Sequence, residues 1–192
     1  MSKAAELAAL IGSQTALSNR NLIINGAMQV AQRGTSSTSQ SGYGTVDRIY
    51  FSKNNYDELA VTTSQSTVAP SGFSNSFRVQ VTTAESALAA DEFMYWLYRI
   101  EGQDLQHLNF GTSGAKSLTL SFWVRSSLTG TYSVLFYLAD DVRGCTHTYT
   151  INSADTWEYK TITIDGDTTG VIDNDNGIGL DVYFTLSSGS NL

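Results

Sequence analysis

Regular alternation of apolar and polar residues along most of the chain after residue 20 is the feature that most limits its fold. In the segment 117–125, Leu118, Leu120, Phe122 and Val124 occupy every second position. Successive side chains of a β-strand point to opposite faces, so this period of two predicts strands with one buried face and one wet face. The same reasoning predicts strands at about 22–30, 46–51, 58–63, 76–82, 93–100, 117–125, 132–139, 145–151, 157–164 and 179–186.

The expected fold class is all-β, an antiparallel two-sheet jelly-roll sandwich. Strands with one wet face belong in antiparallel sheets, and many of them without long helices between them form a sandwich. A single proline and 16 glycines among 192 residues fit turns built from Gly, Asn, Asp and Ser. We therefore expect one domain over residues 21–192, with a turn or short helix at 104–108, preceded by an N-terminal segment over residues 1–20.

The first residues follow a different period. Apolar residues at positions 4, 7, 8 and 11 share one face of a helix, which predicts a short N-terminal helix over residues 3–11. A helix of this length is marginal in water and needs a neighbour to pack against. A frayed terminus is the alternative. The candidate residues for docking to a neighbour are Leu7, Leu10 and Ile11.

The formal charge of −7 is concentrated in one part of the chain. Residues 140–181 hold nine acidic side chains against two basic ones. An acidic surface repels phosphate backbones and anionic lipid headgroups, so we expect no nucleic-acid partner. No apolar stretch reaches membrane-spanning length and the start of the chain does not resemble a secretory signal. We expect no membrane insertion, and assembly in the cytoplasm.

Residue types that carry catalysis are sparse. Cys145 is the single cysteine and is interpreted as a small apolar filler of its strand. His107 and His147 have no second His or Cys at ligand spacing, which argues against a zinc site. The chain lacks a Gly-x-Ser-x-Gly nucleophile elbow, and its adjacent carboxylate pairs are expected to point apart. The sequence predicts no catalytic residue and a protein that is not an enzyme.

An acidic loop over residues 165–177 is the candidate metal site. Calcium ions take six or more oxygen ligands, often several carboxylates from one loop. The alternative is a tight turn at Asn176 and Gly177 between two strands, surrounded by solubilising aspartates. No cofactor is expected other than a structural calcium ion in this loop. The candidate calcium ligands are Asp165, Asp167, Asp173 and Asp175.

Carbohydrate binding has the most support from residue types. Sugar rings stack on aromatic side chains while their hydroxyls bond to polar groups, so a binding face interleaves the two. Trp123 with Arg125, and Tyr183 with Asp181, are expected on the non-core faces of their strands. Trp96 lies in a segment with bulky residues on both faces, one covered by protein or used for contact. A surface between subunits or under a loop is the alternative for Trp123, and a strand buried on both faces for Trp96.

Several segments together resemble a recurring family of phage virion proteins. They are 21–34 with its following Ser/Thr run, 45–51, 99–102, 117–125, 130–134, 155–164 and 166–170. The family comprises tail fibres and related structural proteins with a jelly-roll domain similar to carbohydrate-binding modules. Its members usually continue beyond the equivalent of 181–186 with a further strand. Either this chain is a fragment without that strand, or a partner covers the sheet edge.

The resemblance implies a function on the virion. We expect a tail fibre or fibre-like subunit that docks to other virion proteins through its N-terminus and binds host-surface carbohydrate without turnover. A homotrimer located in the virion tail is the state typical of such fibres. The alternatives are a carbohydrate-binding module of a secreted or tail-associated glycan-degrading enzyme, and a head decoration or adaptor protein.

Overall fold

The structure, a computed structural model, describes residue 3 and residues 21–191. The N-terminal helix predicted over 3–11 falls largely outside these residues. The docking candidates Leu7, Leu10 and Ile11 lie outside them as well, so their role stays a prediction.

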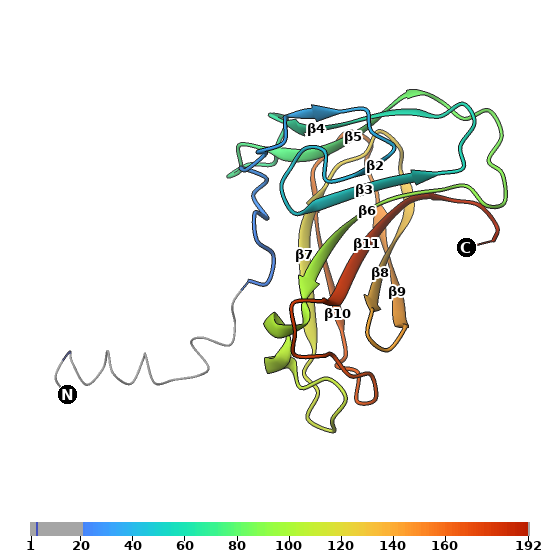
Figure 1. Ribbon diagram of the computed structural model, residues 1–192. Coiled ribbons are helices and arrows are strands. Elements are labelled where there is room, and N and C mark those ends of the chain that lie inside the picture. Colours follow the sequence, from blue (N-terminus) through green and yellow to red (C-terminus); the bar gives the residue numbers. More distant parts are fainter. Residues whose placement is uncertain (1–2, 4–20, 192) are drawn as a thin grey trace.

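A six-stranded antiparallel sheet forms the larger layer of the molecule (Figure 1). β6 and β11 lie at its centre, and their long pairing is the main connection between its two halves. In order across the sheet, the strands are β2 (Ser41–Gly42), β3 (Ile49–Asn54), β6 (Phe93–Glu101), β11 (Ile178–Ser188), β8 (Gly130–Leu138) and β9 (Arg143–Ile151).

The remaining strands form two smaller hydrogen-bonded groups. β1 (Ser36–Ser37), β4 (Ala60–Ser66) and β5 (Ser76–Thr83) make a three-stranded sheet, and β7 (Leu118–Val124) pairs with β10 (Glu158–Ile164). Two 3₁₀ turns, η1 (Gly102–Asp104) and η2 (Gln106–Leu108), confirm the predicted turn or short helix at 104–108. No helix among the described residues is long and apolar enough to cross a membrane. The all-β antiparallel prediction is confirmed. The strands form three hydrogen-bonded groups, and the jelly-roll arrangement of the sandwich stays a prediction.

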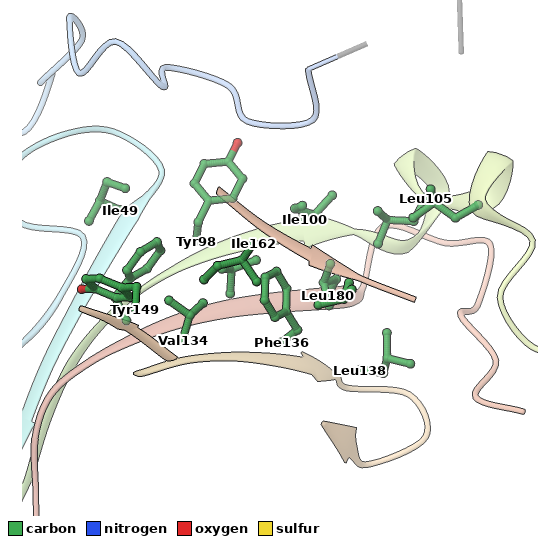
Figure 2. Packing of buried hydrophobic residues seen from close by; sticks show 14 of the residues in the cluster. Ile49, Tyr98, Ile100, Leu105, Val134, Phe136, Leu138, Tyr149, Ile162 and Leu180 are labelled. Atoms are coloured by element: carbon green, nitrogen blue, oxygen red, sulfur yellow. The ribbon is translucent and has the colours of Figure 1, made fainter. Parts of the chain in front are cut away.

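The main core lies between the six-stranded sheet and the β7–β10 pair (Figure 2). Val134 and Phe136 of β8 and Leu180 of β11 pack with Ile162 of β10, and all four are buried. The alternating residues of β7 face this core, as the sequence predicts. Burying one such side chain contributes about 1.5–3 kcal/mol. The period-two pattern is therefore the source of the two-layer packing.

A second, smaller core lies between the six-stranded sheet and β4. Phe51 of β3 and Met94 of β6 contact Leu59 and Val61, the latter on β4. All four are buried. The β1–β4–β5 sheet therefore covers one end of the same sheet face that β7 and β10 cover at the other.

The strand predicted at 22–30 is wrong, because this segment forms a turn. Asn25 and Met28 have positive φ angles of 61° and 55°, which breaks an extended conformation. The Asn25 side chain donates to the carbonyl of Val30 at 2.9 Å and holds the bend. The Ile24 amide donates to the hydroxyl of Tyr98 at 2.7 Å, so the segment is fixed over the main core (Figure 2).

Glu158 fixes the corner between β9 and β10. Its carboxylate accepts hydrogen bonds from Lys160 Nζ at 2.7 Å and from the backbone amides of Asn152 and Ser153 at 2.8 and 2.9 Å. The Lys160 ammonium and then these amides lower the pKa of Glu158 from 4.5 to about 2.

Because that pKa is depressed in the folded state, Glu158 stabilises the fold above pH 4.5 and loses this effect as the pH falls toward 2. Glu158→Gln is therefore expected to lower the melting temperature at neutral pH, with a difference from the native protein that narrows on acidification. Thermal melts between pH 7 and pH 3 measure this. The exposed Glu58→Gln is the control, and a Glu158→Gln difference that does not vary with pH would contradict the role of the charge.

Candidate functional site

The outer face of the six-stranded sheet, opposite the core, carries a group of aromatic side chains. Strand register places Tyr50 of β3, Leu97 of β6 and Tyr183 of β11 in one row across three neighbouring strands. The next row brings Arg99 of β6 beside Asp181 of β11 and Tyr137 of β8. We call this surface the tyrosine face and define it by Tyr50, Tyr95, Tyr137 and Tyr183 with Arg99 and Asp181.

Three rings of the tyrosine face, those of Tyr95, Tyr183 and Tyr137, contact one another in a series. Tyr183 lies at its centre, with ring centroids 5.0 Å from Tyr95 and 6.4 Å from Tyr137. Phe93 stacks on Tyr95 at 5.6 Å. Leu97 is 0% exposed although it belongs to neither core cluster, so its neighbours on the outer face cover it completely. The result is an aromatic surface with an apolar base, held on rigid strands.

Arg99, Asp181 and Tyr183 form the polar centre of this face. Arg99 Nε lies 3.3 Å from Asp181 Oδ1 and 3.4 Å from Oδ2, and the Tyr183 hydroxyl donates to Oδ2 at 3.2 Å. The Arg99 guanidinium also lies over the Tyr50 ring, 5.2 Å from its centroid. Asp181 is only 3% exposed, so it acts by positioning Arg99 and Tyr183, whose side chains are partly accessible.

Burial controls the protonation of this centre. It raises the pKa of Asp181 above the ordinary value, and the Arg99 charge and the Tyr183 hydroxyl oppose that rise. Burial and the Asp181 charge raise the pKa of Tyr183 to about 12. Tyr183 therefore keeps its proton at physiological pH and remains a hydrogen-bond donor.

The structure divides the predicted glycan-binding residues among three places. Tyr183 and Asp181 lie on the tyrosine face, as expected of the non-core face of their strand. Trp96 does not: its ring stacks on Phe184 of β11 at 3.9 Å and 4°, and it meets the Phe77 ring of β5 at 5.8 Å. Trp96 is partly buried and packs against both core clusters, so its assignment to a binding face is corrected.

Trp123 and Arg125 lie on the outer side of the β7–β10 pair, on the other layer of the molecule. Trp123 is 41% exposed beside Tyr159, with centroids 5.3 Å apart, so no described residue covers it as a loop would. Arg125 instead donates to the carbonyl and the carboxylate of Asp155 at 2.8 and 3.0 Å. The two predicted pairs, Trp123 with Arg125 and Tyr183 with Asp181, therefore do not form one site.

The acidic loop between β10 and β11 uses its carboxylates for internal bonds. Asp167 makes an ion pair with Arg143 at 2.7 Å and accepts the amides of Thr169 and Gly170. Asp175 accepts the Gly177 amide at 2.8 Å. Asp165 and Asp173 are exposed, and in the described part of the chain no three His, Cys, Asp or Glu side chains gather where a metal ion could be held. The calcium site at Asp165, Asp167, Asp173 and Asp175 stays a prediction.

The alternative, a tight turn at Asn176 and Gly177 that joins two paired strands, is wrong because the strands on either side of the loop are not paired. β10 and β11 belong to different hydrogen-bonded groups, so the loop crosses between layers and does not join paired strands. Cys145 also differs from its prediction, since it is exposed and not a core filler. It lines a cavity of about 490 Å³ together with Phe136 and Leu138.

The residues of the site that the sequence did not identify are Tyr50, Tyr95, Tyr137 and Arg99. Tyr95 and Arg99 alternate with core residues in β6, so their outward direction follows once the core face of β6 is known. Tyr50 comes beside them only through the pairing of β3 with β6. Strand pairing over such sequence distances leaves no local pattern.

No protein-family model and no curated protein matches the chain. Among solved structures, the chain is similar to the enzymatically active domain of tailspike protein 4 of bacteriophage CBA120. The two share 16% identity with a TM-score of 0.49, over 88% of this chain and 19% of the tailspike chain, so the chain spans about a fifth of the length of that protein. The prediction that the chain is not an enzyme is contradicted by this finding, because the tailspike domain is described as enzymatically active, and it is withdrawn.

Proposed function

We propose that this chain is a carbohydrate-binding domain of a glycan-degrading bacteriophage tail protein and that it binds host-surface glycan through the tyrosine face. The observation that carries the proposal is the series of tyrosine rings around Tyr183, on a partly exposed sheet face with a polar centre at Arg99 and Asp181. The virion motifs of the sequence support the assignment to a phage tail.

The chemistry of the face suits sugars. Tyrosine rings present flat apolar surfaces on which sugar rings stack, and their hydroxyl oxygens can accept hydrogen bonds from sugar hydroxyls. Arg99 is held by Asp181 on one side and Tyr50 on the other, so its free N–H groups have a fixed direction. A site placed on strands loses little conformational entropy when it binds.

Multiple copies on one particle would make a weak single site effective. Linked sites bind with an avidity far above that of each site alone. We propose a trimer and a location in the virion tail, with docking through the N-terminal segment, on the resemblance to tail fibres. The jelly-roll assignment of the sandwich belongs to the same proposal.

The proposal is tested by glycan binding of the purified chain on an array of bacterial surface polysaccharides. Tyr183→Ala is expected to weaken binding about five- to tenfold, because it removes the central stacking ring. Tyr183→Phe keeps the ring and is expected to bind nearly as the native chain does. Retained binding in Tyr183→Ala, with loss in Trp123→Ala on the opposite layer, would place the site elsewhere and refute the proposal.

A further inference from the structure

A cleft of about 280 Å³ lies at the Arg99 end of the tyrosine face. Its lining consists of Arg33, Tyr43, Asp47, Arg48 and Arg99. Three of the seven arginines of the chain therefore converge on one cleft, in a protein whose net charge is −7. Tyr43 meets Tyr50 edge to face at 5.2 Å, which makes the cleft continuous with the tyrosine face.

Three carboxylates lie around the cleft, and they engage the three arginines to different extents. Asp181 faces Arg99 from β11, and Glu101 approaches Arg48 to 3.9 Å with both side chains well exposed, which is a weak pair. Asp47 accepts the Gln32 amide at 2.9 Å. Arg33 is exposed, its guanidinium lies 5.8 Å from the Tyr43 centroid, and no acidic side chain pairs with it among residues 21–191.

Convergent arginines beside aromatic rings match one kind of ligand group. The planar guanidinium binds carboxylate or phosphate oxygens through two parallel hydrogen bonds, which a neutral hydroxyl does not reproduce. A neutral glycan would need the tyrosine rings but would gain little from three guanidinium groups. A sugar with an anionic substituent uses both surfaces.

We infer that the arginine cleft binds the anionic group of an acidic glycan whose neighbouring rings stack on the tyrosine face. This inference rests on the proposed function and adds the class of ligand to it. The anionic group binds between Arg33 and Arg48, while Arg99, held by Asp181, forms the boundary between the two surfaces.

Glucuronate and glucose are suitable probes because they differ by one carboxylate. In NMR titrations of the labelled chain, glucuronate is expected to shift the Nε–Hε signals of Arg33 and Arg48, whereas glucose shifts only tyrosine-face signals. Arg33→Gln and Arg48→Gln should each weaken glucuronate binding by about tenfold at low salt, and added salt should weaken it in the native chain. Arg78→Gln, at an exposed arginine of β5, is the matched control.

The outcomes separate the inference from the proposed function. Equal binding of the two sugars, with no effect of Arg33→Gln or Arg48→Gln, would overturn the acidic-glycan inference and leave glycan binding intact. Inorganic phosphate that matches glucuronate in affinity and in every shift would also overturn it, because the sugar would then contribute nothing. Absence of any sugar binding, on the array and in solution, would refute both.

Discussion

Trp96→Ala is expected to lower the free energy of unfolding by about 3–5 kcal/mol. The Trp96 ring stacks on Phe184 at 3.9 Å and meets Phe77 at 5.8 Å, so it links β6, β11 and β5 across the two layers. Alanine would leave a cavity that these strands cannot close by a small shift, because their backbone positions are fixed by sheet hydrogen bonds. Urea denaturation followed by fluorescence and circular dichroism measures the change.

Trp123→Ala is the matched control, since the same residue type is replaced at an exposed position. Trp123 is 41% exposed, so its loss is expected to cost less than about 1 kcal/mol. Equal destabilisation by the two substitutions would contradict the division between core and surface. A folded, stable Trp96→Ala protein with reduced glycan binding would restore Trp96 to a binding face.

Alternation in the sequence predicts most of the strands because burial on one face is a local property. β5, β7 and β11 show it: Phe77, Phe122 and Phe184 all face the core from every-second-residue positions. Which strands become neighbours depends on contacts between distant segments, and no short pattern encodes those. The three hydrogen-bonded groups could therefore not be derived from periodicity, although the all-β class could.

The error at 22–30 has a local cause. Leu22, Ile23 and Ile24 have the composition of a strand, but Asn25 and Gly26 follow directly, and Asn-Gly pairs are strong turn formers. The apolar residues still pack against the main core, since Leu22 and Ile23 contact it. The hydrophobicity of these residues correctly indicated burial, whereas Asn25 and Gly26 determined the backbone conformation of the segment.

Sequence reasoning identified only part of the candidate site. Tyr183 and Asp181 alternate with clearly apolar residues in β11, which identifies their face without ambiguity. β6 is bulky on both sides, so alternation could not tell the Trp96 side from the Tyr95 side. Arg99 is the first charged residue of β6. It lies two residues after Leu97 and four residues after Tyr95, so these three side chains share the outer face of the sheet.

Arg99→Met is expected to destabilise the fold by about 2 kcal/mol at neutral pH, because it leaves the buried Asp181 carboxylate without its cation. Breaking a fully buried pair costs more, but Arg99 is partly exposed, so water screens part of its charge. Methionine keeps the apolar stem of arginine. Arg78→Met, at an exposed position of β5, controls for the change of side chain and is expected to have little effect.

The destabilisation by Arg99→Met should depend on pH in a defined direction. Burial already raises the pKa of Asp181, and loss of the Arg99 charge raises it further. A carboxyl with a raised pKa in the folded state favours folding below its ordinary pKa of 3.8, and this advantage is lost as the pH rises through the folded value. The difference between Arg99→Met and the native chain should therefore shrink as the pH falls from about 7 toward 4.

A double-mutant cycle with Asp181→Asn separates charge from packing. Asparagine removes the buried charge, so the Arg99→Met, Asp181→Asn double variant is expected to be more stable than Arg99→Met alone at neutral pH and to lose its pH dependence. Urea unfolding of the four proteins at several pH values provides the cycle. A penalty for Arg99→Met that is the same at every pH, and that Asp181→Asn does not relieve, would show that Arg99 stabilises the tyrosine face through packing against Tyr50 and not through Asp181.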